Sequence, residues 1–535
     1  MTSANASLSR SSAGAPNAAA DAALISVYDR TGIAELAAAL AAGGVPIYAT
    51  GGTRKHLAAA GIAVDDVGDL TGFPALFDGR VKTLHPNVFG GILADRANPQ
   101  HVAEAQRYGV PAIGTVVVNL YPFEATVARD GATLEEAIEQ IDVGGVSLLR
   151  AAAKNYTNVS VLSDPAQYAG FIAALAAGGP DTGLRRTLAT RAFERTAEYD
   201  SAIARYLEAG LIANDLPGSL ALTIPIEQAL RYGENPQDRA AFYLAREAKL
   251  PEQLSGKTLS YNNLLDLDAT LRLLVRAPRG IAGEQQGATH RAAIVKHTVP
   301  CGVAERGSVA QAVREALDAD PVSAFGGIIA VDGPVDLAAA QVLGEFFLEI
   351  VAAPAFAPDA LERLKKKKNL RIMRYTKGMP ERIAQELRVR SALGGVLAED
   401  DDPQAAPERW HVASRRAPTA AEWTDLTFAW DIVRHVKSNG VTIVREGVTR
   451  GICAGQTNRV SAVRIAGERA GEFARGAACA SDGFFPFADG LAAAADAGVA
   501  AVIAPSGSIR DAEVVAAADE RNIALVFSTH RYFLH

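Results

Sequence analysis

The chain has 535 residues, more than one hydrophobic core usually supports, so we expect two to four domains. Its formal net charge of -7 disfavours broad nucleic-acid binding, although local basic pockets can still bind small phosphorylated molecules. The three cysteines, Cys301, Cys453 and Cys479, lie far apart, which is typical of a reducing compartment and excludes a zinc-type C-x-x-C pair.

Residues 1–20 are rich in alanine and serine and lack the leucine-rich core of a secretory signal, so we expect a disordered tail and leave a targeting role open. The most apolar later segment, 491–505, is dominated by alanine and interrupted by Asp496, which predicts no membrane span. Together with the cysteine usage, these patterns predict a cytoplasmic protein.

Between residues 21 and 165, short apolar runs alternate with helical patterns, which predicts a parallel sheet covered by helices. We expect strands at 23–27, 45–49, 116–119 and 159–162, and helices at 33–42, 54–60 and 133–140. A helical extension and linker are expected at 166–216, with a helix at 185–209. From 217 to 535 the pattern is again α/β, with strands at 292–295, 328–331, 441–444, 451–454, 501–504 and 523–527, and a helix ending at Asn439 and Gly440. The weak likeness between the halves predicts α/β layers and no repeat.

The most informative stretch begins where the apolar run 292–295 ends, with Lys296 and His297. The ammonium disfavours a second positive charge, so His297 should stay neutral and accept a proton while Lys296 stabilises an oxyanion. Neighbouring strand residues point to opposite faces, so both can serve one site only if the backbone twists there. Pro300 cannot donate to a sheet ladder and Gly302 tolerates unusual dihedrals, so we expect these two residues just beyond the carboxyl end of the strand. A surface lysine beside a structural histidine remains the alternative interpretation.

Two motifs of the first domain suit a bound anion. The string Thr50-Gly51-Gly52-Thr53 lies between an expected strand and helix, where backbone amides can bind a phosphate, although a structural Gly-Gly turn explains it equally well. In the loop after Gly79, Arg80 and Lys82 have few carboxylates beside them, which favours an anion over a salt bridge.

Other strings combine polar, flexible and aromatic residues. Asp142 opens a helical stretch that reaches Lys154, where the preceding alanines indicate a desolvated ammonium able to transfer protons, with a surface lysine as the alternative. Arg231 and Tyr232 suit a phosphate and a planar base. The phenylalanines at 484–487 lie among glycine and proline, so stacking on a flat ligand competes with burial in the core.

Taken in order from residue 22 to His535, these strings resemble the bifunctional purine biosynthesis family, which joins AICAR formyltransferase to IMP cyclohydrolase. The resemblance implies an α/β fold with an N-terminal methylglyoxal-synthase-like parallel-sheet domain followed by tandem cytidine-deaminase-like α/β domains, in a homodimer. It implies formyl transfer from 10-formyltetrahydrofolate to the 5-amino group of AICAR, then cyclisation of formyl-AICAR to IMP with loss of water. No metal or redox cofactor is required, and a structural monovalent cation is left open.

By the same resemblance, the cyclohydrolase residues are Tyr28, Asp29, Arg30, Thr50, Gly51, Gly52, Thr53, Arg80, Val81, Lys82, Thr83, Asn119, Leu120, Tyr121, Asp142, Val143 and Lys154. Lys154 is expected to transfer the proton, with Asp142, Tyr121 and Lys82 around the reacting carboxamide and formyl groups.

The implied AICAR contacts for formyl transfer are Arg231, Tyr232, His297, Gly326, Glu349, Asn439, Arg459, Phe484 and Arg531, and the folate contacts are Val460, Asp489, Ser508 and Ile509. His297 is expected to act as the base and Lys296 at the formyl oxygen, with Asn439 orienting the pair. The chain departs from the family pattern at Val299, where many bacterial members have Asn, at Thr50 for a common Ser, and at Glu349 for Asp in some relatives. These departures bear only on affinity.

Two other functions compete with this one. A zinc deaminase needs an H-x-E motif with P-C-x-x-C, and Cys301 has no such partner in the sequence. A regulatory protein whose first domain only binds a nucleotide would not need both Asp142 and Lys154, and the chain has both.

Overall fold

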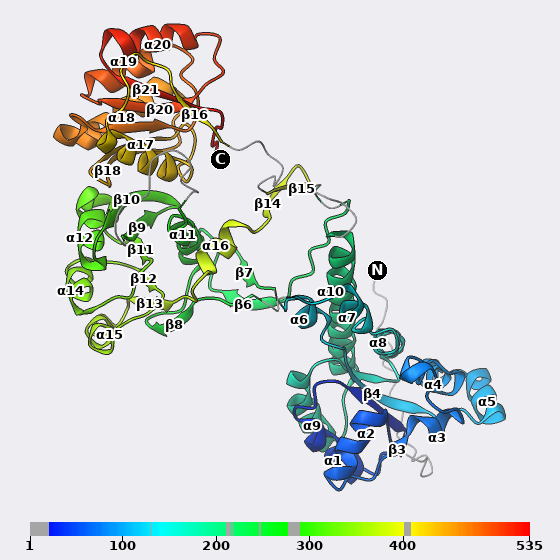
Figure 1. The fold of residues 1–535 in the computed structure, drawn as a ribbon. Helices are drawn as coiled ribbons and strands as arrows, with labels where there is room; N and C mark the ends of the chain where they lie inside the picture. Colours follow the sequence, from blue (N-terminus) through cyan, green and yellow to red (C-terminus); the bar gives the residue numbers. More distant parts are fainter. Residues whose placement is uncertain are drawn as a thin grey trace, which may run out of the picture. The chain divides into compact units, whose positions relative to one another are not determined.

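Figure 1 shows the computed structural model of the chain, which describes residues 21–129, 131–209, 216, 218–245, 248–276, 289–400 and 408–535. The expected tail and most of the expected linker lie outside these residues. The chain divides into two compact units, Met1–Ile224 and Pro225–His535, and each is described by itself. In the part of the chain that is described, no helix is both long and apolar enough to cross a membrane.

The first unit is built on a parallel sheet with the strand order β3-β2-β1-β4-β5. Its strands are β1 (Ala22–Val27), β2 (Ile47–Ala49), β3 (Asp65–Asp66), β4 (Ile113–Asn119) and β5 (Ser160–Leu162). Its helices are α1 (Ile33–Ala42), α2 (Gly51–Ala59), α3 (Val67–Thr71), α4 (Pro86–Leu93), α5 (Pro99–Tyr108), α6 (Phe123–Val127), α7 (Leu134–Glu139), α8 (Gly144–Lys154), α9 (Tyr168–Ala176) and α10 (Thr182–Ala209). The strand order reverses between β1 and β4, and sheets of this kind bind ligands beyond the strand ends at that point.

The second unit contains a 12-stranded sheet with the order β16-β21-β20-β19-β17-β18-β10-β9-β11-β12-β13-β8. One half contains α11 (Tyr261–Arg272), β9 (His290–Lys296), β10 (Val299–Arg306), α12 (Val309–Ala319), α13 (Pro321–Ala324), β11 (Ile328–Val331), α14 (Leu337–Glu345), β12 (Ile350–Ala353), α15 (Pro358–Lys365) and β13 (Arg371–Arg374). The other contains α17 (Ala420–Val433), β17 (Val441–Arg445), β18 (Val448–Cys453), α18 (Arg459–Ala470), β19 (Ala478–Ser481), α19 (Ala488–Asp496), β20 (Ala501–Pro505), α20 (Asp511–Glu520) and β21 (Ala524–Ser528).

The two halves of this sheet have the same topology. Each has a helix, then an antiparallel strand pair, then three mutually parallel strands with helices between them. The halves meet where β10 pairs with β18 through Ala304 and Val448. The expectation of no repeat is therefore wrong, because the likeness lies in the order and pairing of the elements.

Six further strands of the second unit form two separate hairpins or the margins of the large sheet. β6 (Ile226–Leu230) pairs with β7 (Ala240–Tyr243), and β14 (Arg388–Ala392) pairs with β15 (Gly395–Glu399). The margins of the large sheet are β8 (Glu252–Ser255) and β16 (Trp410–Val412), and α16 (Met379–Ala384) follows β13.

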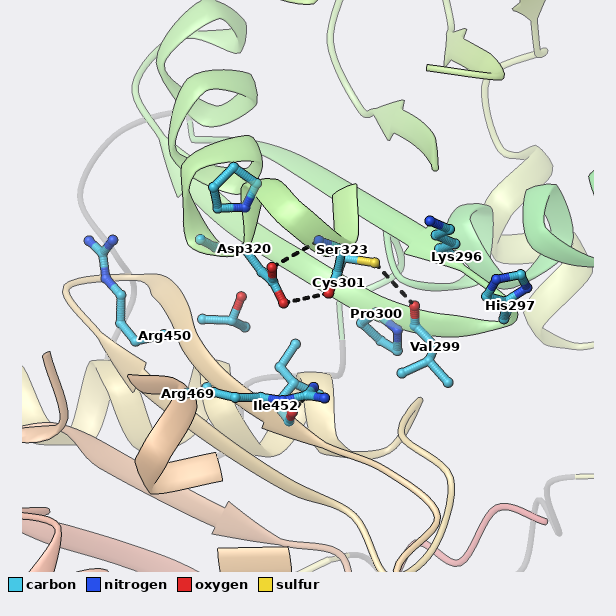
Figure 2. Close-up of a pocket in the computed structure, with 14 residues that line it drawn as sticks. Lys296, His297, Val299, Pro300, Cys301, Asp320, Ser323, Arg450, Ile452 and Arg469 are labelled. Atoms are coloured by element: carbon cyan, nitrogen blue, oxygen red, sulfur yellow. Dashed lines mark hydrogen bonds between the residues drawn. The ribbon is translucent and has the colours of Figure 1, made fainter. Parts of the chain in front are cut away.

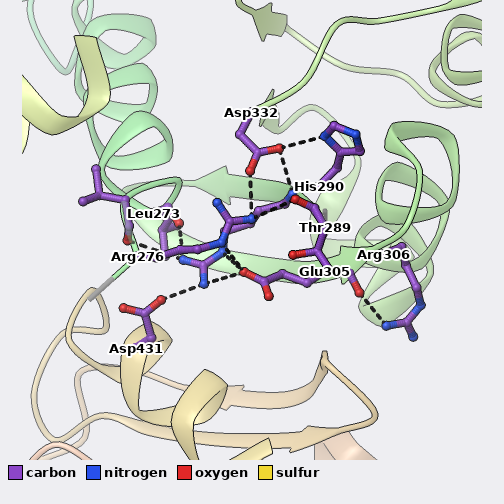
Figure 3. Close-up of polar contacts among 10 residues, drawn as sticks. Leu273, Arg276, Thr289, His290, Glu305, Arg306, Asp332 and Asp431 are labelled. Carbon is purple, nitrogen blue, oxygen red and sulfur yellow. Dashed lines mark hydrogen bonds and ion pairs between the residues drawn. The ribbon is translucent and has the colours of Figure 1, made fainter. Parts of the chain in front are cut away.

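A buried group of ion pairs joins the two halves (Figure 3). Arg291 on β9 is fully buried, and its guanidinium pairs with Glu305 on β10 at 2.8 Å and with Asp431 on α17 at 2.7 Å. Burial opposes the charge of Arg291, yet the two carboxylates raise its pKa. Burial likewise opposes ionisation of Glu305, but Arg291 and then Arg276 lower the pKa of this carboxyl. Each half therefore contributes buried charges, and the opposite charge on the other half offsets part of the cost of burying them.

Two local expectations are corrected. Pro300 and Gly302 lie within β10 and not beyond a strand end; the register shifts between them, which is where a strand tolerates a proline. The helix expected to reach Asn439 and Gly440 ends at Val433, which leaves the two residues to form the loop before β17.

Candidate active sites

The first unit has a cavity of about 900 Å³ beyond the carboxyl ends of β1, β2 and β4. It brings together twelve of the residues expected for the cyclohydrolase: Tyr28, Arg30, Thr50, Gly52, Thr53, Arg80, Lys82, Thr83, Asn119, Tyr121, Asp142 and Val143. Because parallel strands end at one edge of a sheet, motifs from distant parts of the sequence meet there.

Side-chain hydrogen bonds fix the loops at this edge. The Thr53 hydroxyl, in the first turn of α2, accepts from the Val27 N–H and donates to the Val27 carbonyl, both at 3.1 Å. The Asn119 amide accepts from the N–H groups of Tyr28 (2.6 Å) and Asp29 (2.9 Å) and donates to the Asp29 carbonyl (2.7 Å). The α2 N-terminus is thereby held against the end of β1, with its first N–H groups at the cavity.

The approach of an arginine to this N-terminus explains one glycine. A Cβ at Gly52 would come within 2.9 Å of the Arg30 guanidinium, so a larger residue would displace that cation. Helix N–H groups and a guanidinium together suit a phosphate group.

Asp142 lies just before α8 and is held from both sides. Its Oδ1 accepts from the Gly145 N–H at 2.7 Å, and its own N–H donates to the Tyr199 hydroxyl at 2.9 Å. Burial raises the pKa of the Asp142 carboxyl, an effect that the Gly145 hydrogen bond and the Lys82 ammonium oppose in part. A carboxylate with a raised pKa is better matched to proton transfer near neutral pH than an exposed one.

Tyr121 complements this acceptor with a donor. Burial, and after it the charge of Asp142, raises the pKa of the Tyr121 phenol, so its hydroxyl remains protonated. The groups that line the cavity therefore include a titratable acceptor on Asp142, a hydroxyl donor on Tyr121 and an ammonium on Lys82.

Several expected residues lie elsewhere or have other partners. Arg80 forms an ion pair with Glu139, which also lines the cavity, so a carboxylate from a distant segment partners this cation although few carboxylates lie beside it in the sequence. Lys154 is the last residue of α8, at the opposite end from Asp142, and it is exposed although the alanines before it are buried. The expected desolvation of its ammonium is therefore absent. The remaining expected residues outside the cavity wall are Asp29, Gly51, Val81 and Leu120.

Two further residues at this site, Tyr199 and Glu139, were not indicated by any motif in the sequence. Tyr199 is fully buried on α10, where its hydroxyl links the Asp142 N–H to the Gln140 carbonyl. A tyrosine in the apolar stripe of a helix is typical of the core, so no sequence signal indicated this contact.

In the second unit, Lys296 and His297 belong to a two-residue hairpin turn. Lys296 pairs with Val299 across the hairpin, and His297 and Thr298 between them both have positive φ, 56° and 59°. This is the backbone twist that the sequence analysis required for both side chains to serve one site. We call residues Lys296–Val299 the β9–β10 turn.

The β9–β10 turn borders a cavity of about 600 Å³ that opens where β10 and β18 separate (Figure 2). Lys296 and His297 lie at one end of the residues drawn there, and Arg450 at the other. The Lys296 ammonium donates to the Phe325 carbonyl at 2.8 Å, next to Gly326. Neither side chain of the pair is packed into the interior.

The other expected formyltransferase residues do not line this cavity, but most lie on the same edge of the sheet. Strand pairing places the beginning of β11, β12 and β17 and the ends of β18, β19, β20 and β21 on the edge that holds the β9–β10 turn. The residues next to these strand ends are Gly326, Glu349, Asn439, Arg459, Val460, Phe484, Asp489, Ser508, Ile509 and Arg531. Arg231 and Tyr232 instead follow β6.

The edge carries two groups of contacts. Near the turn, Glu349 pairs with Arg371 at 2.8 Å and accepts from Asn263 at 3.4 Å. In the other half, Arg459 pairs with the buried Asp482. Glu349 precedes β12 and Asp482 follows β19, and six strand-to-strand steps of about 4.8 Å lie between these strands, so the groups are separated by roughly 29 Å along the sheet.

Asn439 and the phenylalanines take positions that the sequence left open. The Asn439 amide donates to the Gln456 carbonyl at 2.7 Å, so its contact in this structure is with the loop after β18 and not with His297. Phe485 is buried in the core, whereas Phe484 and Phe487 are exposed. The described residues contain no cluster of three or more His, Cys, Asp or Glu side chains placed to hold a metal ion.

Comparisons with known proteins show the family of the chain. The family model of the AICARFT/IMPCHase bienzyme matches residues 152–469, and that of the MGS-like domain matches residues 32–147. The bifunctional purine biosynthesis protein PurH of Prochlorococcus marinus (strain MIT 9303) is 48% identical over 517 residues, which cover 96% of this chain and 99% of the relative.

The chain belongs to the AICARFT/IMPCHase bienzyme family. PurH of Chloroflexus aurantiacus (strain ATCC 29366 / DSM 635 / J-10-fl) is 49% identical over 518 residues, covering 96% of this chain and 98% of the relative. The crystal structure of ForH matches at 37% identity over 35% of this chain and 97% of that chain, with a TM-score of 0.33. This member of the family is a bifunctional enzyme of purine biosynthesis, with AICAR formyltransferase and IMP cyclohydrolase activities and formyltetrahydrofolate as cosubstrate.

Proposed function

We propose that the two activities occupy the two units, with cyclisation in the cavity beside Asp142 and formyl transfer at the sheet edge that holds the β9–β10 turn. The observation that carries this proposal is that each place has its own proton-handling side chain, Asp142 or His297, beside a lysine ammonium. The domain limits 21–165, 166–216 and 217–535 are part of the same proposal.

In the first unit, ionised Asp142 accepts a proton from the carboxamide nitrogen of formyl-AICAR as this nitrogen attacks the formyl carbon. The formyl oxygen takes up that proton and becomes a hydroxyl group, with Tyr121 and Lys82 donating hydrogen bonds to it. The formamido nitrogen then loses its own proton as it forms the C=N bond of the new ring, and the hydroxyl takes a second proton and leaves as water. The α2 N-terminus and Arg30 bind the phosphate, so positioning supplies much of the rate.

In the second unit, the 5-amino nitrogen of AICAR attacks the formyl carbon of 10-formyltetrahydrofolate, and His297 takes the proton that the amine loses. Lys296 stabilises the negative charge on the formyl oxygen. The bond from the formyl carbon to N10 then breaks, N10 gains a proton, and tetrahydrofolate leaves. Substrates that extend along the sheet edge explain why the expected contacts span several strands.

The test supplies AICAR and 10-formyltetrahydrofolate and follows tetrahydrofolate and IMP separately. His297→Ala is expected to abolish tetrahydrofolate release and still cyclise formyl-AICAR when this is supplied. Asp142→Asn is expected to release tetrahydrofolate and accumulate formyl-AICAR, and the resemblance predicts the same of Lys154→Ala. If each variant loses both steps while remaining folded, the division between the units is wrong.

We also propose a homodimer. Apolar side chains stand exposed on the β14–β15 hairpin, Leu393 and Leu397 among them, and a two-stranded ribbon is marginally stable by itself. A second copy that covers the hairpin would bury these groups. Analytical ultracentrifugation of the full chain is expected to give the mass of a dimer, and a monomer would contradict the proposal.

A cytoplasmic location and a bound monovalent cation complete the proposal. The cysteines Cys301, Cys453 and Cys479 are free thiols in the structure, which suits a reducing compartment. Location is tested by cell fractionation. Cation binding is tested by comparing formyl transfer and unfolding temperature in potassium and in tetramethylammonium salts, where equal values would exclude a structural role.

A further inference from the structure

The β9–β10 turn adopts a backbone conformation that its own residues disfavour. His297 and Thr298 both have φ near +57°, in the left-handed region where glycine and asparagine are usual and a β-branched residue is rare. Something outside the turn must therefore stabilise it. The direction of the His297 imidazole depends on this backbone conformation, because the backbone of the turn sets the direction of the bond from Cα to Cβ.

The stabilising group is the carboxylate of Asp266 on α11. Its Oδ2 accepts from the His297 N–H at 3.1 Å and its Oδ1 accepts from the Thr298 N–H at 2.7 Å. Both oxygens of one side chain are thus used on two successive N–H groups of the turn. One turn earlier on α11, Asn263 donates to Glu349, so the same helix face reaches two of the expected contacts at the sheet edge.

The second half of the sheet contains the same device at its own hairpin. Residues Arg445–Val448, which we call the β17–β18 turn, have Glu446 and Gly447 at positive φ, 55° and 67°. Asp425 on α17 accepts from the N–H groups of Glu446 and Gly447, both at 2.8 Å. Strand pairing puts this turn on the opposite edge of the sheet from His297.

The two turns differ in the two residues that have positive φ. The β17–β18 turn has Gly447, which adopts positive φ at little cost, where the β9–β10 turn has Thr298. Only the β9–β10 turn presents an imidazole. The repeat therefore supplies an internal control, in which the same carboxylate contact exists without a reacting group.

We infer that Asp266 is a positioning residue for formyl transfer, which acts by holding the β9–β10 turn so that His297 meets the AICAR amine. Asp266 touches no substrate in this role. The inference rests on the proposed role of His297 as the base.

The test compares Asp266→Asn with Asp425→Asn in the full chain. An asparagine offers one acceptor oxygen, and its amide N–H groups face the second backbone N–H, so one hydrogen bond of each turn is lost. Asp266→Asn is expected to lower kcat of formyl transfer by about 10- to 100-fold, because small displacements of a reacting group cost this much, with KM for AICAR changed by less than about threefold. Asp425→Asn is expected to leave kcat within about threefold of the parent, since its turn lies at the other edge.

Two further measurements separate positioning from simple loss of structure. Cyclisation of supplied formyl-AICAR by the Asp266→Asn chain is expected to be unchanged. Adding Thr298→Gly to Asp266→Asn is expected to recover part of kcat, because glycine adopts the turn without an external carboxylate.

The outcomes are distinct. If Asp266→Asn leaves kcat unchanged, if Asp425→Asn lowers kcat equally, or if Thr298→Gly recovers nothing, the positioning role is wrong. If His297→Ala retains formyl transfer, the proposed function of the turn fails first, whatever Asp266→Asn does.

Discussion

The two units gather their chemistry in different ways. The first unit places most of its expected site residues around one cavity, at the point where a five-stranded parallel sheet reverses its strand order. The second unit spreads its expected residues along one edge of a 12-stranded sheet, and only Lys296 and His297 border the cavity of Figure 2.

The difference follows from how the sheets are built. Two neighbouring parallel strands bring their loops within one nucleotide's reach, so a small sheet makes a compact site. Two repeats joined through β10 and β18 make a long edge, which suits a nucleotide and a folate together. The first site depends on the loops that follow neighbouring strands. The second site depends on the contacts that hold the two halves of the 12-stranded sheet together.

The largest effect should come from removing an ion pair that joins the two halves of the 12-stranded sheet. Asp431→Asn leaves the fully buried Arg291 with one carboxylate fewer and should destabilise the second unit by about 3–5 kcal/mol. In this variant, formyl transfer should be lost at a lower urea concentration than cyclisation. The measurement follows both activities as the urea concentration is increased. The matched control is Asp496→Asn, which removes an exposed pair with Arg521 and should cost about 0–1 kcal/mol. Equal losses in both variants would mean that the buried group does not hold the halves.

The next effect concerns two lysines of the first unit. Lys82 lines the cavity and Lys154 stands at the far end of α8. From this geometry we expect Lys82→Ala to lower cyclisation of supplied formyl-AICAR by about 100-fold and Lys154→Ala by much less, since only groups at the reacting atoms stabilise developing charge. Steady-state kinetics decide the point. An equal loss would show that the Lys154 ammonium takes part in cyclisation, as the resemblance implies.

A smaller effect is a shift of pH dependence. Asp142 must be ionised to accept a proton, so cyclisation should fall as pH drops through its pKa, which burial raises above the ordinary 3.8. Lys82 opposes this increase, so Lys82→Met should raise the pKa further and move the acid limb of the kcat profile to higher pH. Formyl transfer by the same chain should keep its profile. An acid limb that stays in place would remove Asp142 as the base.

The smallest effect should come from the rim of the first cavity. Glu139 pairs with Arg80, and both are largely exposed, so the pair contributes little to stability. Glu139→Gln frees Arg80 for the substrate phosphate, and KM for formyl-AICAR should fall by up to about fivefold, the effect of about 1 kcal/mol. Glu135→Gln on the same helix is the control and should leave KM unchanged. An increased KM would mean that Glu139 helps to bind the substrate.

Local sequence determined many elements of the fold. The apolar runs predicted β1, β2, β4 and β5 and, in the second unit, β9, β11, β17, β18, β20 and β21, and the box of Thr133 and Glu136 predicted the start of α7. These features depend on residues close in sequence, through period-two and helical patterns and through capping side chains. The resemblance to a known family implied the residues of the first site, and twelve of them line the cavity because parallel strands bring the loops at their carboxyl ends to one edge.

Packing between distant segments decided the rest. Asp266 reaches His297 across 31 residues, Asp142 reaches Tyr199 across 57, and Arg291 pairs with Asp431 on another repeat. Each of these side chains has an ordinary local context, so no periodicity or spacing distinguishes it. Sequence alone therefore determined many of the strands, the motifs and the family, while the tertiary structure decided which carboxylate holds the turn and which lysine lines the cavity. The physical reason is that hydrogen bonds and ion pairs form between atoms brought within about 3 Å, and only the packed chain sets those distances.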